Sequence, residues 1–332
     1  MGWNGALLGS FGKNFTVTPV CRLGHMRNLG YSEVMSAVAP RAAVEALREV
    51  LKSGFDLATD PHRQKVALPH GEMHLLPSAL DGAVGVKVLG IQPAGSQVDV
   101  PLVQGSYLLM GGETLTPEVV MDAAALTEAR TPAVAVAGVL DRLRASSEPL
   151  ECVIVGAGVQ GRAHARTVVD VLAGVREVSV SFISRSEPAD LSYPWVESGS
   201  AAADEVLGRA GLVVVATSAG EPVVVDRQLR SDATVLAVGA HTVDTRELHE
   251  DVLRDAQVIV EDAGGLRGGR LAMWRSRWRR GRLRGRMWRR WLRLCAGMWR
   301  WIRRGGWCLR PSACRGRTWR WRGLLPARPR RR

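Results

Sequence analysis

The feature that most constrains this chain is a glycine-rich turn between an apolar run and a helix-compatible segment. Residues 151–164 read Glu-Cys-Val-Ile-Val-Gly-Ala-Gly-Val-Gln-Gly-Arg-Ala-His. The apolar run is typical of a strand that is buried on both faces. Gly156, Gly158 and Gly161 have the G-x-G-x-x-G spacing of turns that bind the pyrophosphate of a dinucleotide.

Each glycine has a separate role in such a turn. Gly156 permits the tight bend, Gly158 admits the pyrophosphate to the backbone, and Gly161 lets the helix lie close to the sheet. The phosphates bind the free N–H groups of the first helical turn, where the helix dipole favours negative charge. Val159 and Gln160 occupy that turn, and the sequence therefore predicts that these five residues bind a cofactor.

The chain after this turn alternates apolar runs with helix-compatible segments. The further strands are expected at Val178–Ile183, Leu212–Ala216, Thr234–Val238 and Val258–Val260. Runs of valine without polar alternation require a sheet covered on both faces. We therefore predict the α/β class, with a Rossmann-type doubly wound parallel sheet.

The chain before the turn has a different pattern. A helix is expected from Pro40 to Gly54, residues 56–65 form a loop, and a long helix spans Thr127 to Arg144. A turn at Pro77 is among those that separate the short strands. Those strands are expected at Met73–Leu76, Val84–Leu89, Tyr107–Met110 and Val119–Met121. The parallel sheet is thus preceded by a mixed α+β domain.

The end of the second strand of the parallel sheet indicates which dinucleotide binds. NAD-dependent enzymes usually place Asp or Glu there to bind the ribose 2′-hydroxyl. This chain has Ser184 and Arg185 followed by Ser186, and an arginine flanked by hydroxyls favours a 2′-phosphate. We therefore expect NADP(H) to be preferred, with NAD(H) as the alternative cofactor.

The C-terminal part of the chain differs in composition from the rest. Residues 265–332 contain 24 of the 45 basic residues, all arginine, and nine of the eleven tryptophans, but no acidic residue. The net charge of +13 therefore comes from this Arg/Trp-rich tail, and the preceding body is acidic.

Three interpretations of the tail remain open. Arginine supplies phosphate contacts and tryptophan supplies stacking, so a nucleic-acid or anionic-membrane arm is compatible with it. A basic segment without apolar periodicity is also typical of disorder. The favoured hypothesis is translation out of frame, because the tail has the composition of a GC-rich gene read in a wrong frame. Reading the coding DNA in its other frames tests this.

Several other classes of protein are not indicated by the composition. The five cysteines form no CxxC motif and no His/Cys pair at metal spacing, so no metal site is expected. The chain shows neither a membrane-length apolar stretch nor a secretory signal, and we expect a cytoplasmic location without membrane partners. Residues 1–25 are expected to be a loose extension, with the structured part beginning at Met26.

Several motifs occur in the order and spacing of a known family. They are the glycine turn, Gly85-Val86-Lys87-Val88, Leu126-Thr127-Glu128-Ala129-Arg130-Thr131, Ala216-Thr217-Ser218, and Val238-Gly239-Ala240-His241 followed by Arg246-Glu247-Leu248. Through these residues the chain resembles the ornithine cyclodeaminase/mu-crystallin family, over residues 27–264. The Arg/Trp-rich tail matches nothing in that family.

The resemblance implies a division into domains. Residues 26–130 correspond to a substrate and dimerisation domain, residues 131–264 to a Rossmann NAD(P)-binding domain, and residues 265–332 to the aberrant tail. A homodimer is also implied. In the family, the C-terminal segment returns to complete the first domain and to close the nicotinamide site.

The resemblance also implies the site residues. Arg63, Lys87 and Arg130 match residues that hold the substrate carboxylate, which guanidinium groups bind bidentately. Lys87 matches the active-site lysine, which holds the carboxylate or polarises a C=N bond, and Thr217 matches a cofactor contact. The alternative is that the arginines are solvated and that the lysine points to water.

His241 occupies the position at which ornithine cyclodeaminases carry an aspartate. Histidine titrates near neutrality and is suited to proton transfer to an imine nitrogen, although it is also compatible with a structural role at a strand end. The resemblance therefore implies an NAD(P)H-dependent oxidoreductase acting at the α-carbon of a small amino or imino acid. Ketimine or pyrroline-carboxylate reduction and amino-acid dehydrogenation are favoured. The alternatives are ornithine cyclodeaminase proper and an inactive NADPH-binding protein.

Overall fold

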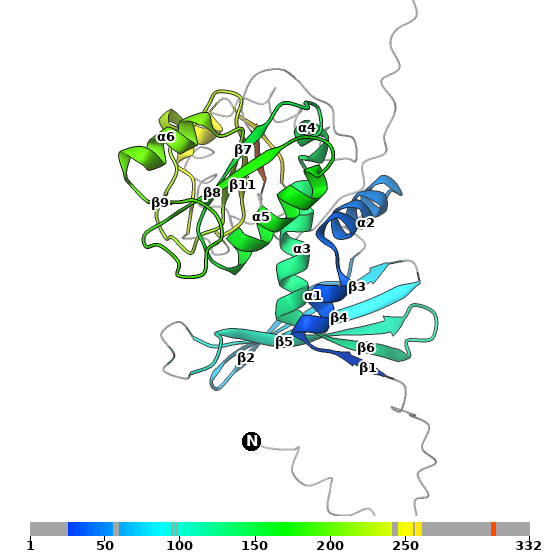
Figure 1. The fold of residues 1–332 in the computed structure, drawn as a ribbon. Helices are drawn as coiled ribbons and strands as arrows, with labels where there is room; N and C mark the ends of the chain where they lie inside the picture. Colours follow the sequence, from blue (N-terminus) through cyan, green and yellow to red (C-terminus); the bar gives the residue numbers. More distant parts are fainter. Residues whose placement is uncertain are drawn as a thin grey trace, which may run out of the picture.

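The described chain contains two sheets, and a long helix, α3 (Ala123–Ala137), runs between them (Figure 1). The computed structural model describes residues 26–55, 60–80, 82–93, 96, 99–240, 245–254, 256–260 and 307–309. The expectations for residues 1–25, for His241 and for most of the tail lie outside these residues.

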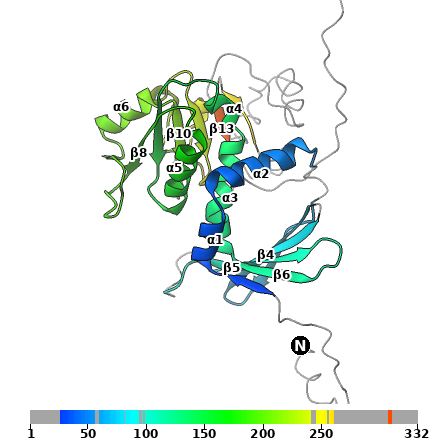
Figure 2. The ribbon, with the colours of Figure 1, turned by 45° about the vertical axis from the view of Figure 1, so that its right-hand side comes forward.

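The first sheet has six strands, in the order β1-β6-β5-β4-β3-β2. The strands are β1 (Arg27–Leu29), β2 (Gln64–Leu68), β3 (Gly71–Leu80), β4 (Ala83–Ile91), β5 (Val103–Gly111) and β6 (Pro117–Asp122). β2 to β6 pair antiparallel in chain order, whereas β1 joins β6 in parallel. The helices α1 (Tyr31–Ala37) and α3 contact each other and lie on one face of this sheet (Figure 2). These elements confirm the mixed α+β region before the parallel sheet.

Two local expectations in this sheet are wrong. The end of the expected loop 56–65 belongs to β2, which pairs with β3 from Gln64 opposite Leu75. Pro77 lies inside β3 rather than at a turn. Because β2 reaches only Leu75, β3 has one neighbour at Pro77, and proline is tolerated at such an edge position.

The long helix begins and ends earlier than expected. Asp122 caps α3, since its Oδ1 accepts a hydrogen bond from the backbone N–H of Ala125 at 2.7 Å. α3 ends at Ala137, and a separate short helix, α4 (Leu140–Leu143), follows. Asp122 belongs to β6 as well, so the chain passes directly from the first sheet into this helix.

The second sheet is parallel throughout and has the order β12-β13-β11-β10-β7-β8-β9. Its strands are β7 (Leu150–Val155), β8 (Val178–Ser184), β9 (Trp195–Glu197), β10 (Leu212–Val215), β11 (Thr234–Ala237), β12 (Gln257–Val258) and β13 (Trp307–Leu309). The helices α5 (Val159–Leu172) and α6 (Ala201–Arg209) connect successive strands. The strand order reverses at β7, and this confirms the doubly wound Rossmann-type fold.

The central strands are buried on both faces, as the valine runs predict. Ile154 and Val214 belong to a core that includes residues of α3 and α5, whereas Val153 and Val213 belong to a second core that includes α6. Burial of each such side chain contributes about 1.5–3 kcal/mol to folding. The two cores therefore fix the sheet between its two helix layers.

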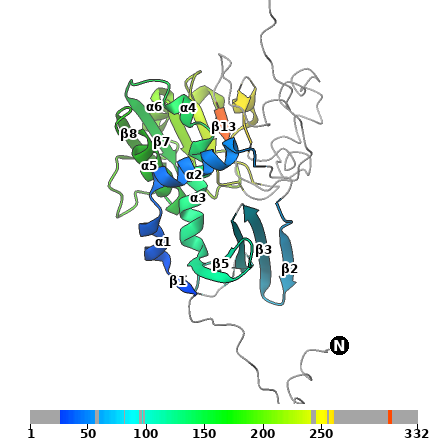
Figure 3. The same ribbon diagram turned by 90° about the vertical axis from the view of Figure 1, so that its right-hand side faces the viewer.

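Three residues of the Arg/Trp-rich tail take part in the second sheet. Trp307–Leu309 form β13, which pairs in parallel with both β11 and β12 (Figure 3). The domain division expected from the sequence placed this segment outside the Rossmann domain, but these backbone pairs join it to that domain's sheet.

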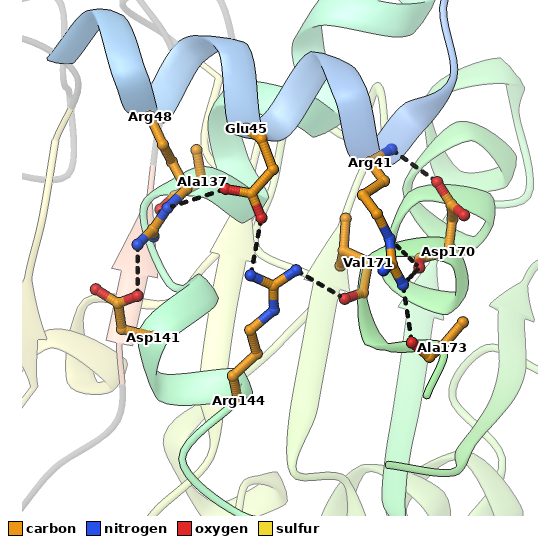
Figure 4. Close-up of polar contacts among 9 residues, drawn as sticks. All are labelled: Arg41, Glu45, Arg48, Ala137, Asp141, Arg144, Asp170, Val171 and Ala173. Atoms are coloured by element: carbon orange, nitrogen blue, oxygen red, sulfur yellow. Dashed lines mark hydrogen bonds and ion pairs between the residues drawn. The ribbon is translucent and has the colours of Figure 1, made fainter. Parts of the chain in front are cut away.

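Helix α2 (Pro40–Lys52) packs on α3 and α5 (Figure 4). The guanidinium of Arg41 donates to the carbonyl oxygens of Asp170 and Ala173, at 2.6 and 2.8 Å, near the end of α5. Glu45 accepts a hydrogen bond from Arg144 at 2.8 Å. These contacts hold α2 against the part of the molecule that contains the second sheet and the glycine turn. We call this part the second lobe, and the part that contains the first sheet the first lobe.

Candidate functional site

The glycine turn has the geometry that its sequence predicts. Gly156 has a φ of +108°, a conformation that favours glycine, and a Cβ there would lie 2.4 Å from the carbonyl oxygen of Ala216. A Cβ on Gly161 would lie 1.9 Å from the carbonyl oxygen of Gly156. Close backbone contact therefore requires glycine at both positions, and it holds α5 against β7 and β10.

Gly158 differs from these two glycines, because it faces open space. A Cβ at this position would meet no atom of the described chain within 4 Å. Gly158 is also the N-cap of α5 and supplies no side-chain cap, while Val159 beside it is 60% exposed. The open backbone and the uncapped helix N-terminus fit the pyrophosphate of a dinucleotide.

The side chain of Gln160 turns away from the glycine turn and towards α3. Its Nε2 donates to the backbone carbonyl of Thr127 at 3.4 Å. Its Oε1 is buried and has no hydrogen-bond partner among the described residues. The first turn of α5 is thereby joined to the helix that carries Arg130.

Lys87 lies beside Thr127, and both Arg130 and Arg63 are near enough to act on it electrostatically. Lys87 lies on β4 and donates to Thr127 Oγ1 at 3.3 Å, and Arg130 lies one helical turn further along α3. Burial, and then the positive charges of Arg130 and Arg63, together lower the pKa of Lys87 to about 8. Arg63 itself is exposed and directly precedes β2.

Thr127 has a role that the sequence did not assign, although it stands in a quoted motif. Its Oγ1 donates to the carbonyl oxygen of Ala123 at 2.7 Å, so a lone pair remains to accept from Lys87. Thr127 thus contacts Lys87 through its side chain, and Gln160 of α5 through its carbonyl oxygen. We call Lys87, Arg130 and Arg63 the cationic group, and α5 the nucleotide helix.

Tyr107 was not identified from the sequence and belongs to the same face of the sheet. It lies directly opposite Lys87 in the register of β5 and β4. A Cβ on Gly85 would lie 1.9 Å from the Tyr107 hydroxyl, so only glycine at position 85 leaves room for the Tyr107 ring. Burial, and then the negative charge of Asp60, raises the pKa of Tyr107. Only strand register could have shown this contact.

Thr217 lies just beyond the carboxyl end of β10, and its polar groups are directed to Glu247. The backbone N–H of Thr217 donates to Glu247 Oε1 at 2.7 Å, and its hydroxyl donates to the same oxygen at 2.9 Å. The sequence indicated Thr217 as a cofactor contact but assigned no role to Glu247, although Glu247 stands in the quoted Arg-Glu-Leu motif.

The end of β8 places Arg185 at the surface. The Ser184 hydroxyl donates to the Ser186 carbonyl oxygen at 2.7 Å and accepts from Trp195 Nε1 at 2.8 Å. Arg185 is exposed. The Ser184 hydroxyl therefore serves the local turn, and the arginine is the residue presented to solvent.

Two kinds of feature are absent from the residues that the structure describes. No group of three His, Cys, Asp or Glu side chains there has the arrangement of a metal site. No helix in that part of the chain has both the length and the apolar character needed to cross a bilayer.

Comparison with known proteins adds evidence from outside this chain. A sequence profile of the ornithine cyclodeaminase/mu-crystallin family matches residues 28–270. Delta(1)-pyrroline-2-carboxylate reductase of Paracoccus denitrificans is 28% identical over 240 residues, which cover 70% of this chain and 74% of that protein.

Solved structures show the same fold. Thermococcus litoralis Delta(1)-pyrroline-2-carboxylate reductase, in complex with NADH and L-proline, matches with a TM-score of 0.66 and 22% identity. The match covers 86% of this chain and 91% of that one. An archaeal alanine dehydrogenase dimer with bound NAD matches with a TM-score of 0.64 and 20% identity, over 86% and 89% of the two chains.

Proposed function

The chain belongs to the ornithine cyclodeaminase/mu-crystallin family, and we propose that it reduces a small cyclic imino acid bearing a carboxylate. The family and its named relatives make it an NAD(P)-dependent oxidoreductase. The pyrroline-carboxylate class of substrate is proposed because relatives that carry this name are 28% and 25% identical to the chain.

The observation that supports this proposal most strongly is the position of the cationic group. Arg130 and Arg63 act electrostatically on Lys87, and Thr127 connects Lys87 to Gln160 beside the glycine turn. A carboxylate bound there would offset the positive charges that act on Lys87. The acid would then lie next to the start of the nucleotide helix, where a transfer reaction needs it.

We assign the following roles to the chain's own residues. Arg130 and Arg63 bind the carboxylate, and Lys87 binds it or donates a hydrogen bond to the imine nitrogen. His241 moves the proton to that nitrogen, on the sequence argument alone. When bound, the reduced nicotinamide supplies the hydride that completes the reduction.

We propose NADPH as the preferred cofactor. Arg185 is exposed at the end of β8, where the doubly wound fold binds the adenosine ribose. An arginine is suited to the 2′-phosphate, whereas NAD-specific enzymes use a carboxylate at this place.

We also propose a homodimer that forms through the first sheet. Large apolar side chains are exposed on its strands, namely Val66, Leu68, Leu80 and Val103. Soluble monomers rarely leave such a group uncovered. Sedimentation of the wild type and of the Leu68→Lys variant tests this, since a dimer would dissociate in the variant.

The decisive experiment follows NADPH absorbance with the purified full chain. Oxidation of NADPH on addition of Δ1-pyrroline-2-carboxylate is the expected result. Release of ammonia from ornithine, measured separately because that reaction consumes no NADPH overall, would instead indicate cyclodeamination. Nucleotide binding without turnover of any of these acids would show a binding protein, and failure to bind either nucleotide would contradict the proposal entirely.

A further inference from the structure

Glu247 is a buried acid that the proposed reaction does not use. Its exposed fraction is 2%. Its backbone is fixed, because its carbonyl oxygen accepts from the N–H of Val223 at 2.8 Å and the next residue, Leu248, forms a bridge with Val224. The side chain is therefore held in one direction by the strand-like segment that carries it.

The carboxylate of Glu247 accepts four hydrogen bonds. Oε1 accepts from the N–H and the hydroxyl of Thr217, at 2.7 and 2.9 Å. Oε2 accepts from the N–H groups of Gly239 and Ala240, at 2.6 and 3.2 Å. Burial raises the pKa of Glu247, and these four donors oppose the rise. A buried carboxylate is tolerated when it is satisfied in this way.

These donors come from two neighbouring strand ends. Thr217 follows β10 and Gly239 follows β11, so Glu247 links the ends of these two strands at the carboxyl edge of the parallel sheet. The join is tight, since a Cβ on Gly239 would lie 1.9 Å from the Thr217 carbonyl oxygen and 2.5 Å from Glu247 Oε1. Glycine is the residue that fits this contact.

The place of this edge in the fold indicates which part of the cofactor it meets. A doubly wound sheet binds one mononucleotide on each side of the reversal point, along its carboxyl edge. The adenosine half belongs to the side of β8, where the 2′-hydroxyl or 2′-phosphate is recognised. The β10–β11 side is therefore the side of the nicotinamide half.

We infer that Glu247 is a positioning residue for the nicotinamide half of the cofactor site, through the carboxylate that holds Thr217, Gly239 and Ala240 in place. This inference rests on the proposed function, because it requires that the chain bind a dinucleotide. Glu247 is buried beneath the edge and acts through these three residues.

The test compares two probes on the full chain by calorimetry. NADPH contains both halves of the cofactor, whereas 2′,5′-ADP contains only the adenosine end. In Glu247→Gln, an amide NH₂ replaces one oxygen and faces N–H donors, so the contacts to one strand end are lost. We expect the dissociation constant of NADPH to rise about tenfold, while that of 2′,5′-ADP stays unchanged.

A second variant covers the case in which Glu247→Gln does not fold. Thr217→Val removes one donor and keeps the carboxylate, and we expect it to weaken NADPH binding by about threefold, without changing 2′,5′-ADP binding. Thr234→Val is the matched control, because Thr234 is buried at the opposite end of β11. Both dissociation constants should stay at the wild-type values in that control.

The outcomes separate the inference from the proposed function. If the wild type binds neither probe, the proposed function fails. If the wild type binds both and the two test variants bind NADPH normally, the inference is overturned. An equal loss of both probes would also overturn it, since that result indicates a general structural role.

Discussion

Lys87 is a half-buried and Glu247 a buried ionisable group, and the protein surrounds them differently. Glu247 has four hydrogen-bond donors from two strand ends. Lys87 donates to the hydroxyl of Thr127 and has Arg130 and Arg63 as charged neighbours, which lower its pKa. One charge is satisfied by the protein, whereas the other is placed among charges of its own sign.

The difference distinguishes groups that support the framework from groups that bind a ligand. A buried charge destabilises the fold unless partners compensate it. Glu247 has that compensation and holds the sheet edge together. An anion bound at Lys87 would offset the positive charges of its neighbours, and this is the reason for proposing that the substrate carboxylate binds there.

The largest expected effect is the loss of the Lys87 charge. In Lys87→Met we expect kcat/KM for the imino acid to fall about 10³-fold, because one positioned donor of this kind contributes that much. Steady-state NADPH oxidation measures it. Lys65→Met on β2 is the matched control, since Lys65 is 71% exposed. Equal losses in both variants would contradict a special role for Lys87.

The second prediction concerns Arg185, an exposed charge assigned to the ligand. Arg185→Asp is expected to reduce the preference for NADPH over NADH roughly 10- to 100-fold, because a charge-assisted contact to the 2′-phosphate becomes a repulsion. The ratio of the two kcat/KM values measures this. Arg227→Asp, another exposed arginine of the same lobe, should leave the ratio unchanged. An unchanged ratio in Arg185→Asp would remove this residue from the cofactor site.

The third prediction uses the pKa of Lys87, which is about 8 in the free protein. Lys87 is positively charged below that pH and loses its proton above it, so carboxylate binding should weaken as the pH rises. We expect the affinity for pyrrole-2-carboxylate, a substrate-like acid without a basic nitrogen, to fall about tenfold per pH unit above this pKa. Lys87→Arg should move the decrease to higher pH. If the decrease persists unchanged in that variant, another group is responsible.

The smallest expected effect tests a charge that the framework uses. Arg41→Ala removes the hydrogen bonds to the end of α5 shown in Figure 4. We expect the free energy of unfolding, measured in urea, to fall by about 1 kcal/mol. We expect kcat to stay nearly unchanged. Lys52→Ala, at the exposed end of the same helix, is the control. A large loss of kcat in Arg41→Ala would show that this contact also sets the active geometry.

The sequence predicted most of the second lobe, because its signals are local. The valine runs and the three glycines identified the parallel sheet and its turn, and the structure confirms the doubly wound order around β7. The first lobe was harder to predict. β2 and the position of Pro77 depend on which strand pairs with which, and short segments do not encode that pairing locally.

In the candidate site, too, some residues were predicted from local motifs, whereas others depend on contacts between distant segments. The resemblance named Lys87, Arg130 and Arg63, and in the structure both arginines lie within electrostatic reach of Lys87. Thr127 and Glu247 stood in the quoted motifs without a role, since their contacts join segments 40 and 30 residues apart. Tyr107 had no signal of its own, because its position follows from strand register.

By itself, the sequence determined the class of fold, the nucleotide turn and the chemical types available for a carboxylated substrate. Glycine conformation, apolar runs and charge are properties of single residues or short segments, and they are readable without a fold. The tertiary structure alone decided which charges have hydrogen-bond donors from distant segments, as Glu247 has, and which have charges of their own sign nearby, as Lys87 has. That distinction depends on burial and on hydrogen-bond partners from distant segments, and only the folded chain brings these together.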